Sequence, residues 1–155
     1  MRIRKIFLAA ALLAASLLAA TGSPARGENG HDLTLETPGG DSVSLGRLAG
    51  DKPVLLVFWA TWCPICAEEV PKINEVQSRL SDRLRILAID FLESGEKVRK
   101  FMKAKNVSYT VLLDRNGKAA QAYRVVGIPT YVILDRQGKI VYFDNELPPS
   151  IEKFL

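Results

Sequence analysis

The chain has 155 residues, of which 48% are hydrophobic and 25% charged, a size and composition typical of one globular domain. Its formal net charge is +4, but Arg2, Arg4 and Lys5 contribute three of the 21 positive charges before the foldable part begins. The remaining near-neutral balance excludes a strongly basic surface, so we expect no nucleic-acid partner.

The N-terminal segment predicts export. Its basic residues precede an apolar run from Ile6 to Ala20, and small residues follow as far as Ala25. This pattern is typical of a signal peptide, because the run of 15 residues is shorter than the roughly 20 that a membrane-spanning helix needs. We interpret residues 1–25 as a cleaved signal peptide or, alternatively, as an uncleaved N-terminal anchor. Both alternatives place the domain outside the cytoplasm, and we expect it in the periplasm.

The first predicted elements lead to a buried strand. Residues 26–31 predict a short flexible segment, and the patterned domain extends over residues 32–155. Leu33–Glu36 and Ser42–Leu45 alternate apolar and polar residues around a Pro-Gly-Gly-Asp turn, which predicts a β-hairpin. The apolar run Val54–Trp59 lacks alternation and predicts a central strand covered on both faces.

The rest of the chain alternates predicted helices and strands. Apolar spacing over Cys63–Leu80 predicts a helix that is kinked at Pro71. The later elements are a strand at Arg85–Asp90, a helix at Ser94–Lys105 capped by the Ser94 hydroxyl, a strand at Thr110–Leu113, a short helix at Lys118–Arg124, strands at Tyr131–Leu134 and Lys139–Phe143, and about one and a half helical turns after Pro148. The expected fold class is α/β, with a mixed central sheet flanked by helices and an added N-terminal hairpin.

The two cysteines of the chain, Cys63 and Cys66, lie where the buried strand gives way to the predicted helix. Free backbone N–H groups at a helix N-terminus stabilise a thiolate and lower the thiol pKa below its ordinary value of about 8.5. Cys66 lies nearly one turn further along, so its sulfur can reach Cys63 and release a captured partner. The pair therefore predicts thiol–disulfide exchange, with Cys63 as the attacking thiol and Cys66 as the resolving thiol.

The cysteine pair also permits other interpretations, each of which the sequence disfavours. A structural disulfide closing so short a ring stabilises a fold by only about 2 kcal/mol in the loop-entropy estimate. A metal site is not expected, because the pair and the single His31 do not supply four ligands. The peroxidase pattern would require Pro and Thr where the chain has Leu56 and Ala60.

Two segments resemble motifs of the thioredoxin superfamily, and more closely its exported TlpA/ResA-like thiol:disulfide oxidoreductases. The first is Val57–Pro71, with the sequence Val-Phe-Trp-Ala-Thr-Trp-Cys-Pro-Ile-Cys-Ala-Glu-Glu-Val-Pro, and the second is Gly127-Ile128-Pro129-Thr130. The resemblance implies a thioredoxin fold, reversible dithiol–disulfide chemistry, protein substrates and no cofactor. It further implies that disulfides of exported proteins are reduced, for example those of apocytochromes or metal-site assembly proteins, with electrons from a membrane donor.

The resemblance also implies roles for single residues. Glu69 matches an acid close to the active site that influences proton transfer, so the implied catalytic set is Cys63, Cys66 and Glu69. The Pro129 peptide bond is implied to be cis and to lie beside the dithiol, where the backbone of Ile128 can pair with an extended substrate segment. The substrate-binding residues are expected to be Trp62, Pro64, Ile128, Pro129 and Thr130.

The sequence also departs from related patterns. Thioredoxins have a buried Asp where this chain has Val57, which leaves Glu69 as the nearby candidate proton acceptor. The dipeptide Pro64-Ile65 between the cysteines matches neither thioredoxin nor DsbA, and this dipeptide tunes the reduction potential. The alternatives of a net oxidant, or of a non-enzymatic module that holds an apoprotein or a copper ion, therefore stay open. We expect a monomer, with Trp59, Tyr123 and Tyr131 packed in the core or at its edge.

Overall fold

The computed structural model describes residues 22, 24, 26–48 and 50–155. The predicted signal peptide or anchor, with its apolar run, therefore lies almost entirely outside the described residues. Within the described part, no helix is both long and apolar enough to cross a membrane.

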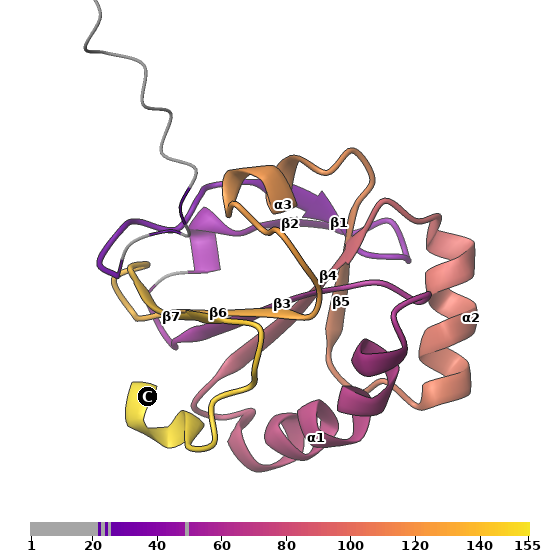
Figure 1. Ribbon diagram of the computed structural model, residues 1–155. Coiled ribbons are helices and arrows are strands. Elements are labelled where there is room, and N and C mark those ends of the chain that lie inside the picture. Colours follow the sequence, from indigo (N-terminus) through magenta and orange to yellow (C-terminus); the bar gives the residue numbers. More distant parts are fainter. Residues whose placement is uncertain (1–21, 23, 25, 49) are drawn as a thin grey trace, which may run out of the picture.

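A mixed β-sheet forms the centre of the molecule (Figure 1). In the described part of the chain its strands are β1 (Thr34–Glu36), β2 (Ser42–Ser44), β3 (Val54–Trp59), β4 (Arg85–Phe91), β5 (Thr110–Asp114), β6 (Thr130–Leu134) and β7 (Ile140–Asp144). They lie in the order β2-β1-β5-β4-β3-β6-β7. β3, β4 and β5 are parallel, whereas the hairpin β1–β2 and the strands β6 and β7 pair antiparallel. The predicted α/β class, mixed sheet and added N-terminal hairpin are confirmed.

Helices cover both faces of the sheet. The elements are α1 (Pro64–Leu80), α2 (Gly95–Lys105) and α3 (Lys118–Ala122), with 3₁₀ turns η1 (Gly46–Leu48) and η2 (Ile151–Phe154). In Figure 1, α3 lies on the opposite side of the sheet from α1. α1 continues through Pro71 to Leu80, and the Ser94 hydroxyl caps α2 as predicted. α3 ends earlier than predicted, because Arg124 adopts a left-handed φ of 53°.

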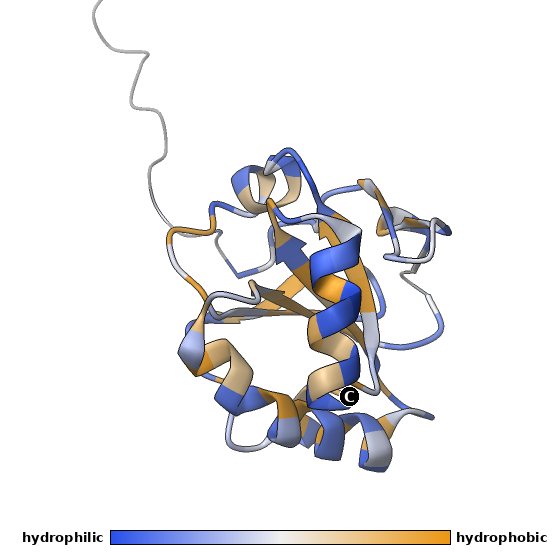
Figure 2. Cartoon of the chain, turned by 90° about the vertical axis from the view of Figure 1, so that its right-hand side faces the viewer, coloured by the Kyte–Doolittle hydropathy of each residue, from blue (hydrophilic) through white to orange (hydrophobic). Residues whose placement is uncertain are grey.

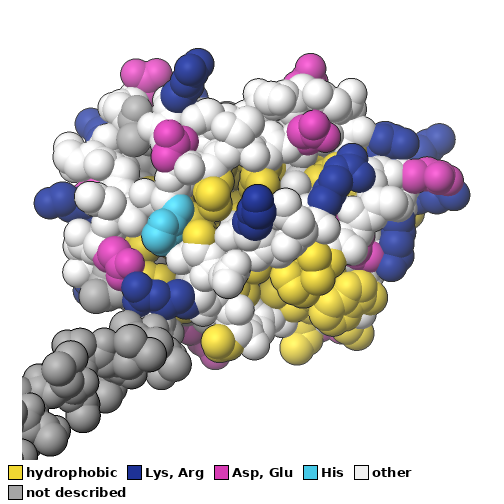
Figure 3. Space-filling model, turned by 90° about the horizontal axis from the view of Figure 1, so that it is seen from above, with side chains coloured by type: hydrophobic (Ala, Val, Ile, Leu, Met, Phe, Trp, Pro, Cys, Tyr) yellow, Lys and Arg dark blue, Asp and Glu magenta, His cyan; other side chains and the backbone are white. Residues whose placement is uncertain are grey.

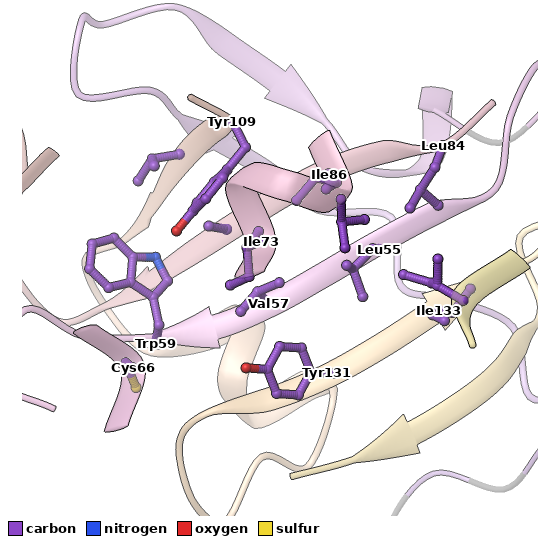
Figure 4. Close-up of a cluster of buried hydrophobic side chains, with 14 of the residues drawn as sticks. Leu55, Val57, Trp59, Cys66, Ile73, Leu84, Ile86, Tyr109, Tyr131 and Ile133 are labelled. Carbon is purple, nitrogen blue, oxygen red and sulfur yellow. The ribbon is translucent and has the colours of Figure 1, made fainter. Parts of the chain in front are cut away.

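Strand alternation divides the core into two layers. In β3, Leu55, Val57 and Trp59 face the layer that contains the buried sides of α1 and α2, a part of which is shown in Figure 4. The alternate residues of β3 face the layer under α3. Every residue of β3 is buried, as its unbroken apolar run predicts. Figure 2 shows the complementary pattern on α2, whose outward side is mainly hydrophilic.

The segment predicted to be flexible pairs with the first residue of β7 and with the turn that precedes it. The N–H of Gly27 donates to the carbonyl of Ile140 at 2.8 Å, and that of Gly30 donates to Gly138 at 2.7 Å. Ile140 in turn donates to the carbonyl of Glu28 at 2.8 Å. Composition alone does not reveal this pairing, because it depends on where β7 ends the sheet.

Candidate active site

A disulfide joins Cys63 and Cys66 at the start of α1, with 5.3 Å between the two Cα atoms. The buried strand β3 ends at Trp59, a short loop follows, and α1 begins at Pro64. Cys63 is the N-cap residue of the helix, and its sulfur accepts a hydrogen bond from the backbone N–H of Cys66 at 3.2 Å. Pro64 suits the first helical position, because its fixed φ is helical and its missing N–H is not needed there. The pair therefore lies at a helix N-terminus, as the sequence predicts.

The surroundings of the two sulfurs differ, although both cysteines are nearly buried, with 5% exposure for Cys63 and 4% for Cys66. The Sγ of Cys63 lies 3.9 Å from the carbonyl oxygen of Ile128, next to side chains that face solvent. Cys66 instead belongs to the core cluster of which Figure 4 shows a part, and it lines a small buried gap with Trp59 and Tyr109. The two sulfurs therefore have different neighbours: Cys63 lies beside the Ile128 carbonyl, and Cys66 faces core side chains.

Exposed apolar side chains surround the disulfide. Trp62 is 60% exposed and Ile65 is 59% exposed, and Leu92 and Val126 are the other large hydrophobic residues exposed in the described part of the chain. Figure 3 shows hydrophobic side chains gathered on one side of the molecule. Trp62, Pro64 and Ile65 flank the cysteines in the sequence and are all exposed, so the start of α1 favours an apolar partner segment.

The turn of residues 127–130 lies beside the Cys63 sulfur and forms one wall of the site. The Ile128–Pro129 peptide bond is cis, as the resemblance implies. The hydroxyl of Thr130 donates to the carbonyl of Gly127 at 2.5 Å, and the Asn145 amide donates to Pro129 at 2.7 Å and to Thr130 at 3.0 Å. Thr130 is only 1% exposed. Its side chain therefore braces the turn, and its role in substrate binding stays a prediction.

Glu69 lies one turn after Cys66 and lines the same buried gap. One carboxylate oxygen pairs with Lys72 at 2.6 Å, and this hydrogen bond and charge raise the pKa of the lysine. The other oxygen accepts a hydrogen bond from the Tyr131 hydroxyl at 3.4 Å. Burial and the nearby Glu69 raise the pKa of Tyr131 well above its usual range, so the hydroxyl stays a donor. Tyr131 is a core residue as predicted, and the structure adds its contact with Glu69.

Two further carboxyl groups lie close to the loop before Cys63, and sequence reasoning missed both. Asp90 ends the apolar part of β4, is 0% exposed, and stands in register with Trp59 of β3. Glu93 follows three residues later and accepts hydrogen bonds from the Thr61 backbone N–H at 2.6 Å and the Thr61 hydroxyl at 2.8 Å. Glu69 is therefore not the one acid near the site. An Asp at the end of an apolar strand was the available signal, but its burial depends on sheet register.

In the described part of the chain, no group of three or more His, Cys, Asp or Glu side chains could hold a metal ion. The chemistry that the described residues offer is exchange at a disulfide, beside apolar side chains and three carboxyl groups.

Comparison with known proteins places this site in a family. Residues 27–143 match the AhpC/TSA family. The chain belongs to that family. It is 37% identical over 117 residues to the thioredoxin-like protein YneN of Bacillus subtilis, covering 74% of this chain and 68% of YneN. It is 34% identical over 120 residues to the thiol-disulfide oxidoreductase ResA of the same organism, covering 77% of this chain and 66% of ResA.

A solved structure from Chlorobium tepidum, assigned as the thiol:disulfide interchange protein DsbE, superposes with a TM-score of 0.75 at 28% identity, covering 82% of this chain and 89% of that one. These likenesses confirm the thioredoxin-like fold and the resemblance to ResA-type proteins, and they place this AhpC/TSA-family chain among the thiol–disulfide oxidoreductases. The matched part spans 68% of the length of YneN and 66% of the length of ResA of Bacillus subtilis, and 59% of the length of ResA of Bacillus thuringiensis.

Proposed function

We propose that this chain is an exported thiol–disulfide oxidoreductase that reduces the disulfides of exported proteins in the periplasm. The observation that carries the proposal is the Cys63–Cys66 disulfide at the N-terminus of α1, with the Cys63 sulfur 3.9 Å from the Ile128 carbonyl and the exposed Trp62 next to Cys63 in the sequence. The signal-peptide pattern of residues 1–25 supports export, and the named activity of ResA supports the reaction class.

The reaction begins from the reduced dithiol. The Cys63 thiolate attacks one sulfur of the substrate disulfide, a new S–S bond joins Cys63 to the substrate, and the second substrate sulfur leaves as a thiolate that takes up a proton. Backbone N–H groups at the start of α1 favour the attacking thiolate, because they lie at the positive end of the helix dipole.

Cys66 completes the exchange. Its thiol loses a proton, and the thiolate attacks the Cys63 sulfur, which restores the Cys63–Cys66 disulfide and releases the reduced substrate. Glu69 is the proposed acceptor of that proton, because it lines the same gap as Cys66. The two electrons come from the dithiol, so a membrane donor must reduce the new disulfide before the next cycle.

The surface around Cys63 suggests how a substrate is held. Trp62 and Pro64 are exposed at the start of α1, and the partly exposed Ile128 and the buried Pro129 belong to the turn beside the Cys63 sulfur. An extended segment between these residues would place its sulfur against Cys63 and pair with the backbone of Ile128. Apocytochromes and metal-site assembly proteins are examples of exported substrates that carry such cysteines.

Replacing the resolving cysteine tests the proposal. The reduced Cys66→Ser chain, incubated with a peptide that contains one disulfide, should accumulate a mixed disulfide through Cys63. The matched control, Cys63→Ser, should not, because Cys66 faces the core. Equal trapping by both variants, or by neither, contradicts the assigned roles.

The reduction potential tests the direction of electron flow. Equilibration of the wild-type chain with glutathione buffers should give a value near −300 mV for a reductant, whereas about −120 mV would identify an oxidant. Mass spectrometry of alkylated samples measures the fraction of the Cys63–Cys66 disulfide at each buffer composition.

A further inference from the structure

The loop of residues 60–62 connects the end of β3 to Cys63. Within it, the N–H of Cys63 donates to the carbonyl of Ala60 at 3.2 Å. The backbone N–H and the hydroxyl of Thr61 both donate hydrogen bonds to Glu93, one to each carboxylate oxygen. Glu93 therefore ties the loop before the nucleophile to the end of the neighbouring strand β4.

The carboxylate that binds Thr61 is charged and almost fully buried. The Glu93 side chain is 5% exposed and forms an ion pair with Lys97, which lies four residues later in the first turn of α2. Burial opposes the charge of Glu93, but the hydrogen bonds from Lys97 and from the Thr61 backbone outweigh it and lower the pKa of the carboxyl. Hydrogen bonds that a buried carboxylate accepts are stronger than those between neutral groups.

Asp90 adds a second carboxyl to the same buried cluster. Its oxygens lie outside the distance and angle limits of a regular hydrogen bond, but the carboxyl is close enough to Glu93 for the two groups to interact. Burial, and then the nearby Glu93, raise its pKa to about 8, while Lys97 of α2 acts in the opposite direction. The residues in register with Asp90 on the adjacent strands, Trp59 and Leu113, carry no charge. Of the two carboxyl groups, Asp90 is therefore the one whose surroundings favour the protonated form, and Glu93 the one whose surroundings favour the charged form.

On the basis of the proposed function, we propose that Glu93 is a positioning residue for exchange at Cys63, acting through Thr61, and that the buried Asp90 sets how firmly Glu93 holds that loop. When Asp90 loses its proton to solvent at alkaline pH, a second negative charge appears beside Glu93. Repulsion between the two carboxylates then weakens the hydrogen bonds to Thr61. The position of the Cys63 sulfur thereby depends on a proton that takes no part in the exchange.

Removing the charge of Glu93 gives the first test. The reduced full chain is mixed with glutathione disulfide, and the rate at which Cys63 becomes glutathionylated is measured in the Cys66→Ser background. Glu93→Gln should react about tenfold more slowly, since misplacement of a reacting group by about 1 Å can cost up to about 100-fold in rate. Glu96→Gln is the matched control, because Glu96 pairs only at the surface with Lys100, and it should react like the parent. Equal rates for Glu93→Gln and the parent overturn the proposal.

The pH profile separates positioning from a merely structural role. At pH 6 Asp90→Asn should match the parent, because Asp90 is uncharged in both. Above pH 8 the parent should fall behind Asp90→Asn by several-fold. Identical profiles would overturn the role of Asp90.

A double variant tests whether Glu93 acts through Thr61. In Thr61→Val/Glu93→Gln the exchange rate should be no lower than in Glu93→Gln alone, because both changes break the same contact. Additive losses would contradict action through Thr61.

The reactivity of the parent Cys66→Ser chain distinguishes failure of the proposed function from failure of this inference. If the Cys66→Ser chain fails to react with glutathione disulfide and with peptide disulfides, the proposed function itself is wrong. If it reacts and Glu93 and Asp90 variants follow it at every pH, only this inference fails. Should Glu93→Gln not fold, as judged by circular dichroism, Asp90→Asn and Thr61→Val decide the question.

Discussion

The two walls beside the disulfide are held in different ways. The loop before Cys63 is fixed by the buried carboxylate of Glu93, which accepts both hydrogen bonds of Thr61. The turn before Pro129 is fixed by neutral groups, the hydroxyl of Thr130 and the amide of Asn145. A charged brace responds to pH and a neutral one does not. The loop before Cys63 is therefore the side of the site whose hydrogen bonds we expect to depend on pH.

Asp90→Asn should produce the largest change, because it removes the pH dependence of the charged wall. The folded-state pKa of Asp90 is about 8 against an ordinary 3.8, so the unfolded chain ionises first as pH rises. Between these values the free energy of unfolding of the wild type should fall by about 1.4 kcal/mol per pH unit, and the loss should end above pH 8. Glu93 acts in the opposite sense, but only around and below its own ordinary value of 4.5. Asp90→Asn should therefore be the more stable protein from pH 5 upward, by a margin that widens to pH 8.

Urea unfolding of the oxidised chain from pH 5 to pH 9 measures this margin. Asp82→Asn is the matched control, since Asp82 is exposed and its variant should follow the wild type. Parallel curves for Asp90→Asn and the wild type would show that Asp90 is ionised in the folded chain.

Thr130→Val should give an intermediate effect on the neutral wall. Valine keeps the shape of the buried side chain but loses its hydrogen bonds to Gly127 and Asn145. We expect the free energy of unfolding to fall by about 1–2 kcal/mol, by the same amount at pH 5 and at pH 9. A loss that changes with pH would remove the distinction between the two walls.

Tyr131→Phe should have the smallest effect on stability. The hydroxyl makes one long hydrogen bond, at 3.4 Å, to a carboxylate that Lys72 already neutralises. We expect a loss of no more than about 1 kcal/mol in thermal unfolding, unchanged between pH 6 and pH 9 because the wild-type tyrosine does not ionise there. A larger loss would mean that Glu69 depends on Tyr131 for its position.

The elements that the sequence predicts best are those with strong local signals. The unbroken apolar run Val54–Trp59 and the cysteines after it predict a buried strand, a helix start and the disulfide between them, and all three are present. The missed features are tertiary. Asp90 becomes a buried acid only when β4 pairs with β3 and α2 covers that end of the sheet, and Thr130 is withdrawn from the surface only by the turn that it braces.

The strand-like course of residues 27–30 also protects the molecule from its own copies. A free outer strand offers unpaired N–H and C=O groups to any other extended chain, and this is a common start of aggregation. Here the backbone of Ile140 already gives and receives hydrogen bonds with Glu28 and Gly27, so that stretch of β7 has no vacancy for another polypeptide. At the far end of the sheet, β2 is only three residues long, too short to template much pairing. The start of β7 is thus closed to edge-to-edge pairing at Ile140, and the opposite margin of the sheet is short.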